Sequence, residues 1–242
     1  MLDIRNTVRE ICNRRPRIVV LPIGAVEQHG GHLPVGTDWI IAEEIALRVA
    51  KELDAFLLPG LPFSMSQCHG PSPGTVWLTP LTLAAVVEDL VTALYKQGLR
   101  TIVIINGHGG NFILPDIVED LCDRYKGLEL ILLPEFPELV EYFFSAEAAK
   151  SDIHAGEVET SIQLFLNKDY VVLEEMQDFV PAAGREYLDY VFLPDLSPSG
   201  VWGRPSKSNP DKGRDYLEAY VNACVRYVRD TLHSQAAQKR RK

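Results

Sequence analysis

Residues 17–22 read Arg-Ile-Val-Val-Leu-Pro, a short continuous apolar run that is rich in β-branched side chains. Such a run is typical of a strand that is buried on both faces of a sheet. Three further stretches have the same character: Ala55-Phe-Leu-Leu-Pro, Thr101-Ile-Val-Ile-Ile-Asn and Leu128-Glu-Leu-Ile-Leu-Leu-Pro. These four stretches are predicted to be buried strands.

Helical patterns lie between and after these strands. Residues 38–53 repeat apolar side chains on one helical face, with Thr37 as the predicted N-cap. A second helix is predicted from Thr79 and Pro80 to Gln97, a third from Asn111 to Gly127, and a last one after Asn209-Pro210. Buried strands that alternate with helices predict the α/β class. We expect one three-layer domain over residues 1–242, with a mostly parallel sheet flanked by helices.

Composition excludes several classes of partner. The chain has 242 residues and a net charge of −9, which argues against a nucleic-acid surface. The one basic run, at residues 239–242, is expected to be a solvated terminus. No apolar run is long enough to cross a membrane, and the charged first residues do not resemble a secretory signal. The four cysteines form no Cys-x-x-Cys pair. A cytoplasmic protein is expected.

Two segments that follow predicted strands carry the chemistry. Residues 24–38 read Gly-Ala-Val-Glu-Gln-His-Gly-Gly-His-Leu-Pro-Val-Gly-Thr-Asp, and residues 105–111 read Ile-Asn-Gly-His-Gly-Gly-Asn. The carboxyl ends of parallel strands meet at one edge of a sheet, where ligands bind. In extended backbone, Glu27 and His29 point the same way. With Asp38 in the first turn of a helix, and with His108, they form a candidate metal site.

A third segment, residues 151–161, contains His154, Glu157 and Glu159. If Gly156 precedes a helix, both glutamates fall in its first turn, where a carboxylate also interacts favourably with the helix dipole. The long stretches 60–79 and 194–213 are rich in Gly and Pro and are expected to shape a pocket. Cys68 lies beside His69, but neighbouring residues rarely face each other, so a thiol nucleophile is not predicted.

Mixed carboxylate and imidazole ligands suit zinc, manganese or iron, and a carboxylate such as Asp38 can bridge two ions. Each residue alone has an ordinary structural interpretation; their joint occurrence favours a metal site. The chain lacks the nucleophile elbow of serine hydrolases, the phosphate-binding loop and the dinucleotide fingerprint.

The segments 24–38, 106–111 and 154–161 together resemble those of the creatininase family, metal-dependent amidohydrolases. The resemblance implies a compact α/β domain, homo-oligomers that are often hexamers, and a site for two divalent ions. Glu27, Asp38 and His108 would hold one ion, and His29 with the bridging Asp38 would hold the second. A bridging hydroxide would attack the amide carbonyl of a small molecule, and His154 would protonate the leaving nitrogen.

Two departures from the creatinine-hydrolysing members affect the expected substrate. Those members have Tyr-Glu directly after the histidine that matches His108, and the glutamate is a ligand; here Gly109 and Gly110 follow. Glu157 is the candidate replacement, with the choice between it and Glu159 left open. The acid that precedes the histidine matching His154 is replaced by Ile153. Creatinine is therefore disfavoured, and a formamide on a ribosylaminopyrimidine phosphate is the preferred substrate class.

Three residues are predicted to bind the substrate. His32 and His69 would line the pocket, although a hydrogen bond to loop backbone is an equal alternative for each. Arg204 would meet a phosphate, with Lys207 as a second candidate. Alternative functions are creatinine hydrolysis, cleavage of a peptide tail in cofactor maturation, and non-catalytic metal-dependent binding of a small molecule. A sugar-binding or isomerase site also remains open.

Overall fold

A single parallel sheet forms the centre of the protein. The computed structural model describes residues 1–239 and the side chains of residues 1–234, so the side chains of the basic run 239–242 lie outside it. The strands of the described chain are β1 (Ile18–Ile23), β2 (Phe56–Leu57), β3 (Thr101–Asn106) and β4 (Glu129–Leu132), in the order β2-β1-β3-β4. The central pair, β1 and β3, is in register from Ile18↔Thr101 to Ile23↔Asn106. Every pairing in the sheet is parallel.

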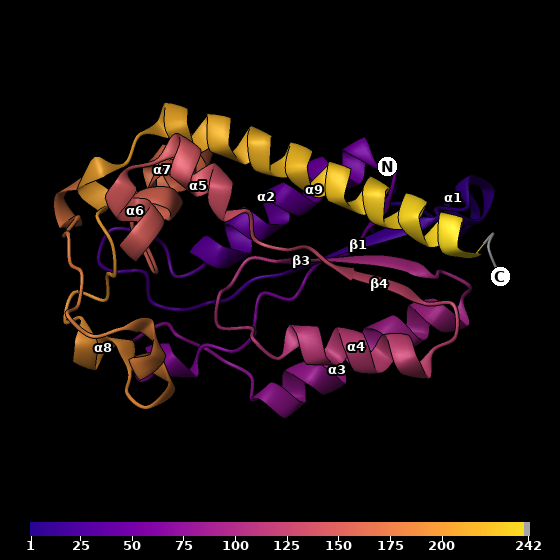
Figure 1. Cartoon of the computed structure of the whole chain (residues 1–242), viewed down its shortest axis with the longest axis horizontal. Coiled ribbons are helices and arrows are strands. Elements are labelled where there is room, and N and C mark those ends of the chain that lie inside the picture. Colours follow the sequence, from indigo (N-terminus) through magenta and orange to yellow (C-terminus); the bar gives the residue numbers. More distant parts are fainter. Residues whose placement is uncertain (240–242) are drawn as a thin grey trace.

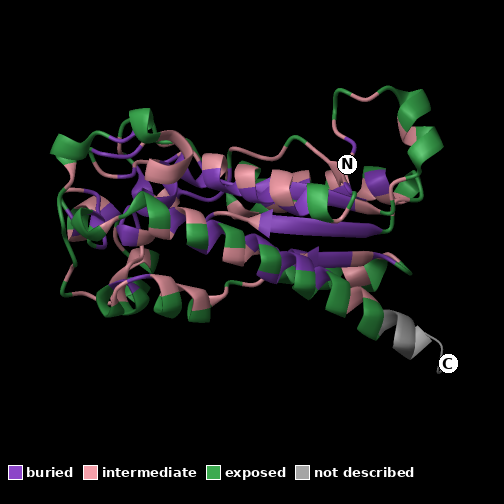
Figure 2. Ribbon diagram, turned by 90° about the horizontal axis from the view of Figure 1, so that it is seen from above, coloured by how far each residue is buried: buried purple, intermediate pink, exposed green. Residues whose placement is uncertain are grey.

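Helices cover both faces of this sheet (Figure 1). Their bounds are α1 (Val8–Arg14), α2 (Thr37–Glu52), α3 (Pro80–Lys96), α4 (Leu114–Arg124), α5 (Pro137–Phe143), α6 (Ala146–Ser151), α7 (Glu157–Asn167), α8 (Leu193–Leu196) and α9 (Pro210–Lys239). Helices α3 and α4 lie on one side of the sheet, whereas α2, α7 and the long α9 lie on the other. The strands between these layers are buried (Figure 2). The expected α/β domain with three layers is confirmed.

The alternation of side chains along β1 divides the core in two. Val20 packs with the α2 and α9 side, while Val19 and Leu21 pack with α3 and α4. All three side chains are fully buried. Both faces of β1 are covered by apolar side chains, and the strand itself therefore contains no polar residue between Ile18 and Ile23.

Two predicted helix caps are wrong, and both residues have another role. The N-cap of α2 is Gly36, and the Thr37 hydroxyl donates to the Pro34 carbonyl instead. Asn111 precedes the N-cap of α4 by two residues; its side chain accepts from the Met65 amide and donates to Asn106. By contrast, Thr79 caps α3 as predicted, by accepting from the Thr82 amide.

The two long stretches that were expected to shape a pocket contain short helical turns. Residues 60–79 include the 3₁₀ turn η1 (Gln67–His69), and residues 194–213 include η5 (Pro205–Lys207). A further turn, η4 (Arg185–Asp189), precedes α8. Within residues 1–239, no helix combines the length and apolar character needed to span a bilayer.

Candidate metal centre

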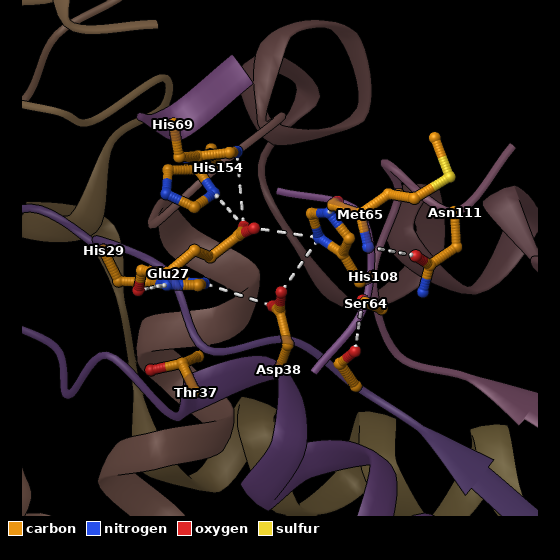
Figure 3. A network of polar contacts seen from close by, with 12 residues as sticks. Glu27, His29, Thr37, Asp38, Ser64, Met65, His69, His108, Asn111 and His154 are labelled. Atoms are coloured by element: carbon orange, nitrogen blue, oxygen red, sulfur yellow. Dashed lines mark hydrogen bonds and ion pairs between the residues drawn. The ribbon is translucent and has the colours of Figure 1, made fainter. Parts of the chain in front are cut away.

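The carboxyl ends of the central strands bring the predicted ligands together. Glu27 and His29 follow β1, His108 follows β3 by two residues, and Asp38 lies in the first turn of α2. Figure 3 shows these side chains pointing toward one another, with His69 and His154 beside them. All of these side chains are buried. The topology therefore gathers residues from four separate segments, as the sequence predicted for this edge of the sheet.

Asp38 lies at the middle of the cluster. Its Oδ1 is 3.1 Å from Nε2 of His29, and its Oδ2 is 2.9 Å from Nδ1 of His108. Glu27 is the second carboxylate, with Oε1 3.3 Å from the same His108 nitrogen. One carboxylate thus faces two imidazoles on its two sides, which is the arrangement that a bridging ligand requires.

Three imidazoles are oriented by backbone carbonyls. Nδ1 of His29 lies 3.1 Å from the Glu27 carbonyl, Nε2 of His108 lies 2.6 Å from the Met65 carbonyl, and Nε2 of His154 lies 2.6 Å from the Gln28 carbonyl. A carbonyl can only accept, so in each ring the nitrogen beside it carries the hydrogen. When the ring is neutral, the other nitrogen has the lone pair that can bind a metal. Histidines that bind metals are typically fixed in this way.

The carboxylates toward which these lone pairs point lack hydrogen-bond donors. Both side-chain oxygens of Glu27 and Oδ2 of Asp38 are buried without a hydrogen-bond partner in the described chain. A buried carboxylate that faces the lone pair of a neutral imidazole is repelled by it, and uncompensated burial of the charge is costly, so the cluster must take up protons or cations. A divalent cation between the oxygens and nitrogens would remove both problems, so the residues present fit a metal.

Three groups of ligand atoms are compact enough to hold an ion. They are Glu27 with Asp38 and His108, His29 with Asp38 and Glu159, and Glu27 with His29 and His154; the ligand atoms of each group lie within 4.8 Å of one another. The first two groups share only Asp38. This is the division into two ion sites that the resemblance implied, with Glu159 as the extra ligand of the second group.

Glu157 does not take the position expected of it. Its Oε1 is 3.0 Å from Nζ of Lys212, and its Oε2 accepts from the Ser145 hydroxyl at 2.5 Å. Glu159, two residues further along α7, has its Oε2 3.7 Å from Nε2 of His29. Of the two glutamates between which the sequence left the choice open, this geometry favours Glu159 as the ligand, because residues two apart on a helix face different directions.

The backbone before α7 holds Glu159 in place. Its Oε2 accepts from the amide of Ala155 at 2.6 Å. Ala155 is fully buried and has φ of +51°, in the left-handed region that an alanine rarely adopts. Residues in such conformations cluster at functional sites, where the surroundings hold them. Here the unusual turn directs an N–H at the carboxylate.

Burial and mutual charge make the cation-free cluster retain protons. Burial raises the pKa of the Glu27 carboxyl to about 8. Burial lowers the pKa of His108, but the Glu27 and Asp38 carboxylates outweigh this effect and raise it to about 9. The pKa of His29 is also raised well above its usual range, because Asp38 and Glu159 outweigh its burial. Cations would have to displace these protons.

His69 and His154 are two further imidazoles of the cluster, and both line a cavity. Burial lowers the pKa of His69 to about 3 and that of His154 well below its usual range, so both rings are neutral near pH 7. The Gln28 amide nitrogen is 3.1 Å from Nδ1 of His69, and its amide oxygen accepts from Gly30. With Nδ1 as the acceptor, Nε2 of His69 carries the hydrogen and faces Oε1 of Glu27 at 3.3 Å. His69 thus presents an N–H toward Glu27 at this distance, outside the geometry of a hydrogen bond.

The cavity has a volume of about 860 Å³ and is lined by Asp38, His108, His154 and Glu159 of the cluster, among others. Of the three predicted substrate-binding residues, His69 lines this cavity and the other two do not. His32 is fully buried, with Nε2 3.0 Å from the Thr160 hydroxyl. Arg204 is exposed at the start of η5 and lies outside the cavity. Cys68, which precedes His69 in the chain, remains a thiol, because burial raises its pKa to about 12.

The two glycines after His108 each make room for a specific contact. A Cβ at Gly110 would lie 2.3 Å from Nε2 of His108 and 2.9 Å from the Met65 carbonyl. A Cβ at Gly109 would lie 2.9 Å from Nη2 of Arg185. Gly110 therefore permits the orientation of a ligand ring, and Gly109 permits an arginine to approach the backbone. Neither contact is visible in the sequence, and Arg185 was not predicted as a pocket residue.

Several known proteins are similar over most of the chain. A creatinine amidohydrolase of Pseudomonas putida is 30% identical over 90% of this chain and 89% of its own length. A mycofactocin precursor peptide peptidase of Mycolicibacterium smegmatis is 28% identical over 91% of this chain and 87% of its own. A 2-amino-5-formylamino-6-ribosylaminopyrimidin-4(3H)-one 5'-monophosphate deformylase of Methanothermobacter thermautotrophicus is 34% identical, over 53% of each chain.

Solved structures share the fold. A crystal structure of creatinine amidohydrolase superimposes with a TM-score of 0.82 at 25% identity, covering 94% of this chain and 96% of the other. A mutant creatininase of the Zn-Zn type and a creatininase described as Mn have TM-scores of 0.82 and 0.81, each at 24% identity. They cover 94% and 95% of this chain, and 97% and 98% of theirs. A family model described as creatinine amidohydrolase matches residues 5–228, and the chain therefore belongs to the creatininase family.

Proposed function

We propose that this creatininase-family amidohydrolase cleaves a non-peptide or cyclic C–N amide bond of a small molecule, with two divalent ions at the cluster around Asp38. One observation carries the proposal: both side-chain oxygens of Glu27 and Oδ2 of Asp38 are buried without a hydrogen-bond partner in the described chain, and they face imidazole nitrogens. The first ion would be held by Glu27, Asp38 and His108, and the second by His29, Asp38 and Glu159. Zinc, manganese and iron suit such donors.

Bound divalent ions supply Lewis acidity, which polarises a carbonyl and lowers the pKa of a coordinated water to about 7 in the case of zinc. The chain's own contribution is orientation and proton transfer. His154 is the proposed proton carrier, since it lines the cavity, is neutral, and has its lone pair on Nδ1, 3.7 Å from Oε1 of Glu27, because Nε2 donates to the Gln28 carbonyl. This nitrogen would accept a proton and later give it to the leaving nitrogen of the amide.

The proposed substrate is a formamide on a phosphorylated heterocycle. Three features support it: Ile153 stands where creatinine-hydrolysing members have an acid, Gly109-Gly110 replaces their Tyr-Glu pair, and the cavity of about 860 Å³ has room for a drug-sized molecule. A second candidate is creatinine, favoured by the 30% identity to a creatinine amidohydrolase over nine tenths of the chain. Cleavage of a peptide tail is a further alternative, favoured by the 28% identity to the mycofactocin precursor peptidase.

The test is a side-by-side assay of creatinine, a short peptide and a formylaminopyrimidine ribotide. Protein stripped with a chelator would be supplied with zinc, manganese or ferrous iron before each assay. Metal-dependent release of formate from the ribotide is expected, with creatinine poor or inert. Faster turnover of creatinine would overturn the substrate proposal, and metal binding without turnover of any amide would favour a binding protein.

Assembly as a homo-oligomer, such as the hexamer implied by the family resemblance, is also proposed. The family resemblance supports it; such an assembly would also cover some of the large apolar side chains that the single chain exposes, among them Leu81, Tyr142 and Tyr190. Light scattering on the purified protein measures the mass, and a monomer at micromolar concentration would contradict the proposal.

A further inference from the structure

One basic side chain lies in the wall of the cavity beside the metal centre. Arg185, the first residue of η4, is the one lysine or arginine among the described residues that line the cavity. Its Nη2 donates to the Gly109 carbonyl at 3.2 Å. Because Gly109 directly follows His108, this bond holds the guanidinium next to the first ligand group.

The charge of Arg185 is not neutralised by the protein. No carboxylate of the described side chains lies within ion-pair distance of it. Glu186 also lines the cavity, but its carboxylate turns back to the backbone at Gly184, where a Cβ would lie 2.3 Å from its oxygens. Asp189 lines the cavity too, without an ion pair to Arg185. An arginine has five N–H donors, and the Gly109 carbonyl takes one.

The neighbouring backbone is fitted to this arginine. A Cβ at Gly109 would lie 2.9 Å from Nη2 of Arg185, closer than any side chain could stand without displacing it. The replacement of the Tyr-Glu pair by two glycines therefore does more than enlarge the cavity. Gly109 leaves room beside the proposed metal centre for a planar cation, which can bind two oxygens at once.

We infer that Arg185 binds an anionic group of the substrate, a carboxylate or a phosphate, a few bonds from the scissile C–N bond. The inference rests on the proposed amidohydrolase function and names the substrate class more closely. Arg204, the arginine expected from the sequence to do this, is exposed like Arg185 but lies outside the cavity, and so serves as a matched control.

The test compares three formamides that share one aromatic amine: neutral formanilide, 4-formamidobenzoate and 4-formamidophenyl phosphate. In the wild type, kcat/KM should be higher for the anionic compounds. Arg185→Met should reduce kcat/KM for these compounds by about tenfold to a hundredfold, mainly through KM, as expected for lost charge-assisted hydrogen bonds. Arg185→Lys should keep more of the preference for phosphate than for carboxylate if phosphate is the natural group. Arg204→Met should retain the wild-type preference.

Equal losses on the neutral and anionic formamides in Arg185→Met would overturn the inference, since they would indicate a structural role. A wild type with no anionic preference would also overturn it. If none of the three formamides is turned over, the proposed function fails on these substrates, and calorimetric titration with 4-aminobenzoate and 4-aminophenyl phosphate still tests Arg185. At unchanged metal content, the variant should bind them about tenfold more weakly or worse; equal binding would refute the anion site.

Discussion

Two regions of this protein bury carboxylates completely, and they neutralise them in opposite ways. Glu157, at the start of α7, is paired by the chain itself, with Lys212 of α9 and the Ser145 hydroxyl. Glu27 and Asp38, near the carboxyl ends of the strands, face imidazole nitrogens, and both oxygens of Glu27 and Oδ2 of Asp38 have no hydrogen-bond partner in the described chain. Burial alone therefore does not identify a ligand. What distinguishes the candidate metal centre is that no lysine or arginine neutralises these carboxylates, so the positive charge must come from protons on its imidazoles or from metal ions.

The variant with the largest expected effect is Asp38→Ala, which tests whether the carboxylates at the strand ends bind metal ions. Because Asp38 belongs to both ligand groups, its loss should empty both ion sites and reduce kcat/KM by at least about 10³-fold. Elemental analysis of protein purified without chelator checks the metal content. Full metal content and activity in this variant would show that Asp38 is not the bridge.

His154→Gln separates proton transfer from metal binding. Metal content should be unchanged while kcat falls by about 10²–10⁴-fold, the range typical of an acid–base group. His154 is also part of a third possible ligand group with Glu27 and His29. Loss of an ion in this variant would therefore reassign His154 as a ligand.

Glu159→Gln and Glu157→Gln test the two carboxylates of one helical turn against each other. Glu159→Gln should weaken binding of the second ion, by about 10–100-fold if it behaves like other groups that tune a metal site. Glu157→Gln should leave metal affinity intact. Competition against a coloured chelator measures both, and the opposite pattern would restore Glu157 as the ligand.

Glu157→Gln should instead affect stability. It leaves the Lys212 ammonium without its partner, but this side chain is 41% exposed and can be rehydrated. The free energy of unfolding should therefore fall by only about 1–2 kcal/mol, less than for a fully buried pair. Denaturant unfolding with metal present measures the change. An unchanged free energy of unfolding would show that the ion pair between Glu157 and Lys212 does not stabilise the fold.

The pH dependence of stability should also differ with and without cations. In the cation-free protein the pKa of His108 is raised from 6.5 to about 9, and that of Glu27 from 4.5 to about 8. The stability from each raised pKa is complete below the unfolded value and lost as pH rises through the folded value. Between pH 7 and 9 the cation-free Tm should therefore fall, on the order of 5 °C. Saturating metal should remove most of this fall, as calorimetry would show.

The strands and the convergence of ligands could be predicted because both follow from local patterns and sheet topology. Buried apolar runs identified β1 and β3, and the strand ends brought Glu27, His29 and His108 to one edge. The choice between Glu157 and Glu159 could not be made, because it depends on how α7 is rotated against α9. That rotation is set by contacts between segments far apart in the sequence, such as the bond from Lys212.

The substrate side of the site was less accessible to prediction for the same reason. Arg204 and Arg185 are both exposed and both follow a glycine, and nothing local distinguishes the one outside the cavity from the one in its wall. The signal for Arg185 is the glycine at position 109, whose missing side chain leaves space for the guanidinium. Likewise, Asn111 had the composition of a helix cap, yet it binds the Met65 amide.

The hydrogen bonds of Met65 link the candidate metal site to the mobility of the cavity wall. Its carbonyl accepts from the His108 ring and its amide donates to Asn111, so both polar groups of one loop residue are held by the segment that follows β3. A cation on His108 would fix that ring and, through it, the wall of the cavity formed by residues 65–69. Hydrogen exchange of the amides between Ser64 and His69 should therefore slow when metal is added, and more than exchange in the distant α1. The ion proposed to activate the substrate would therefore also control how often this wall of the cavity opens.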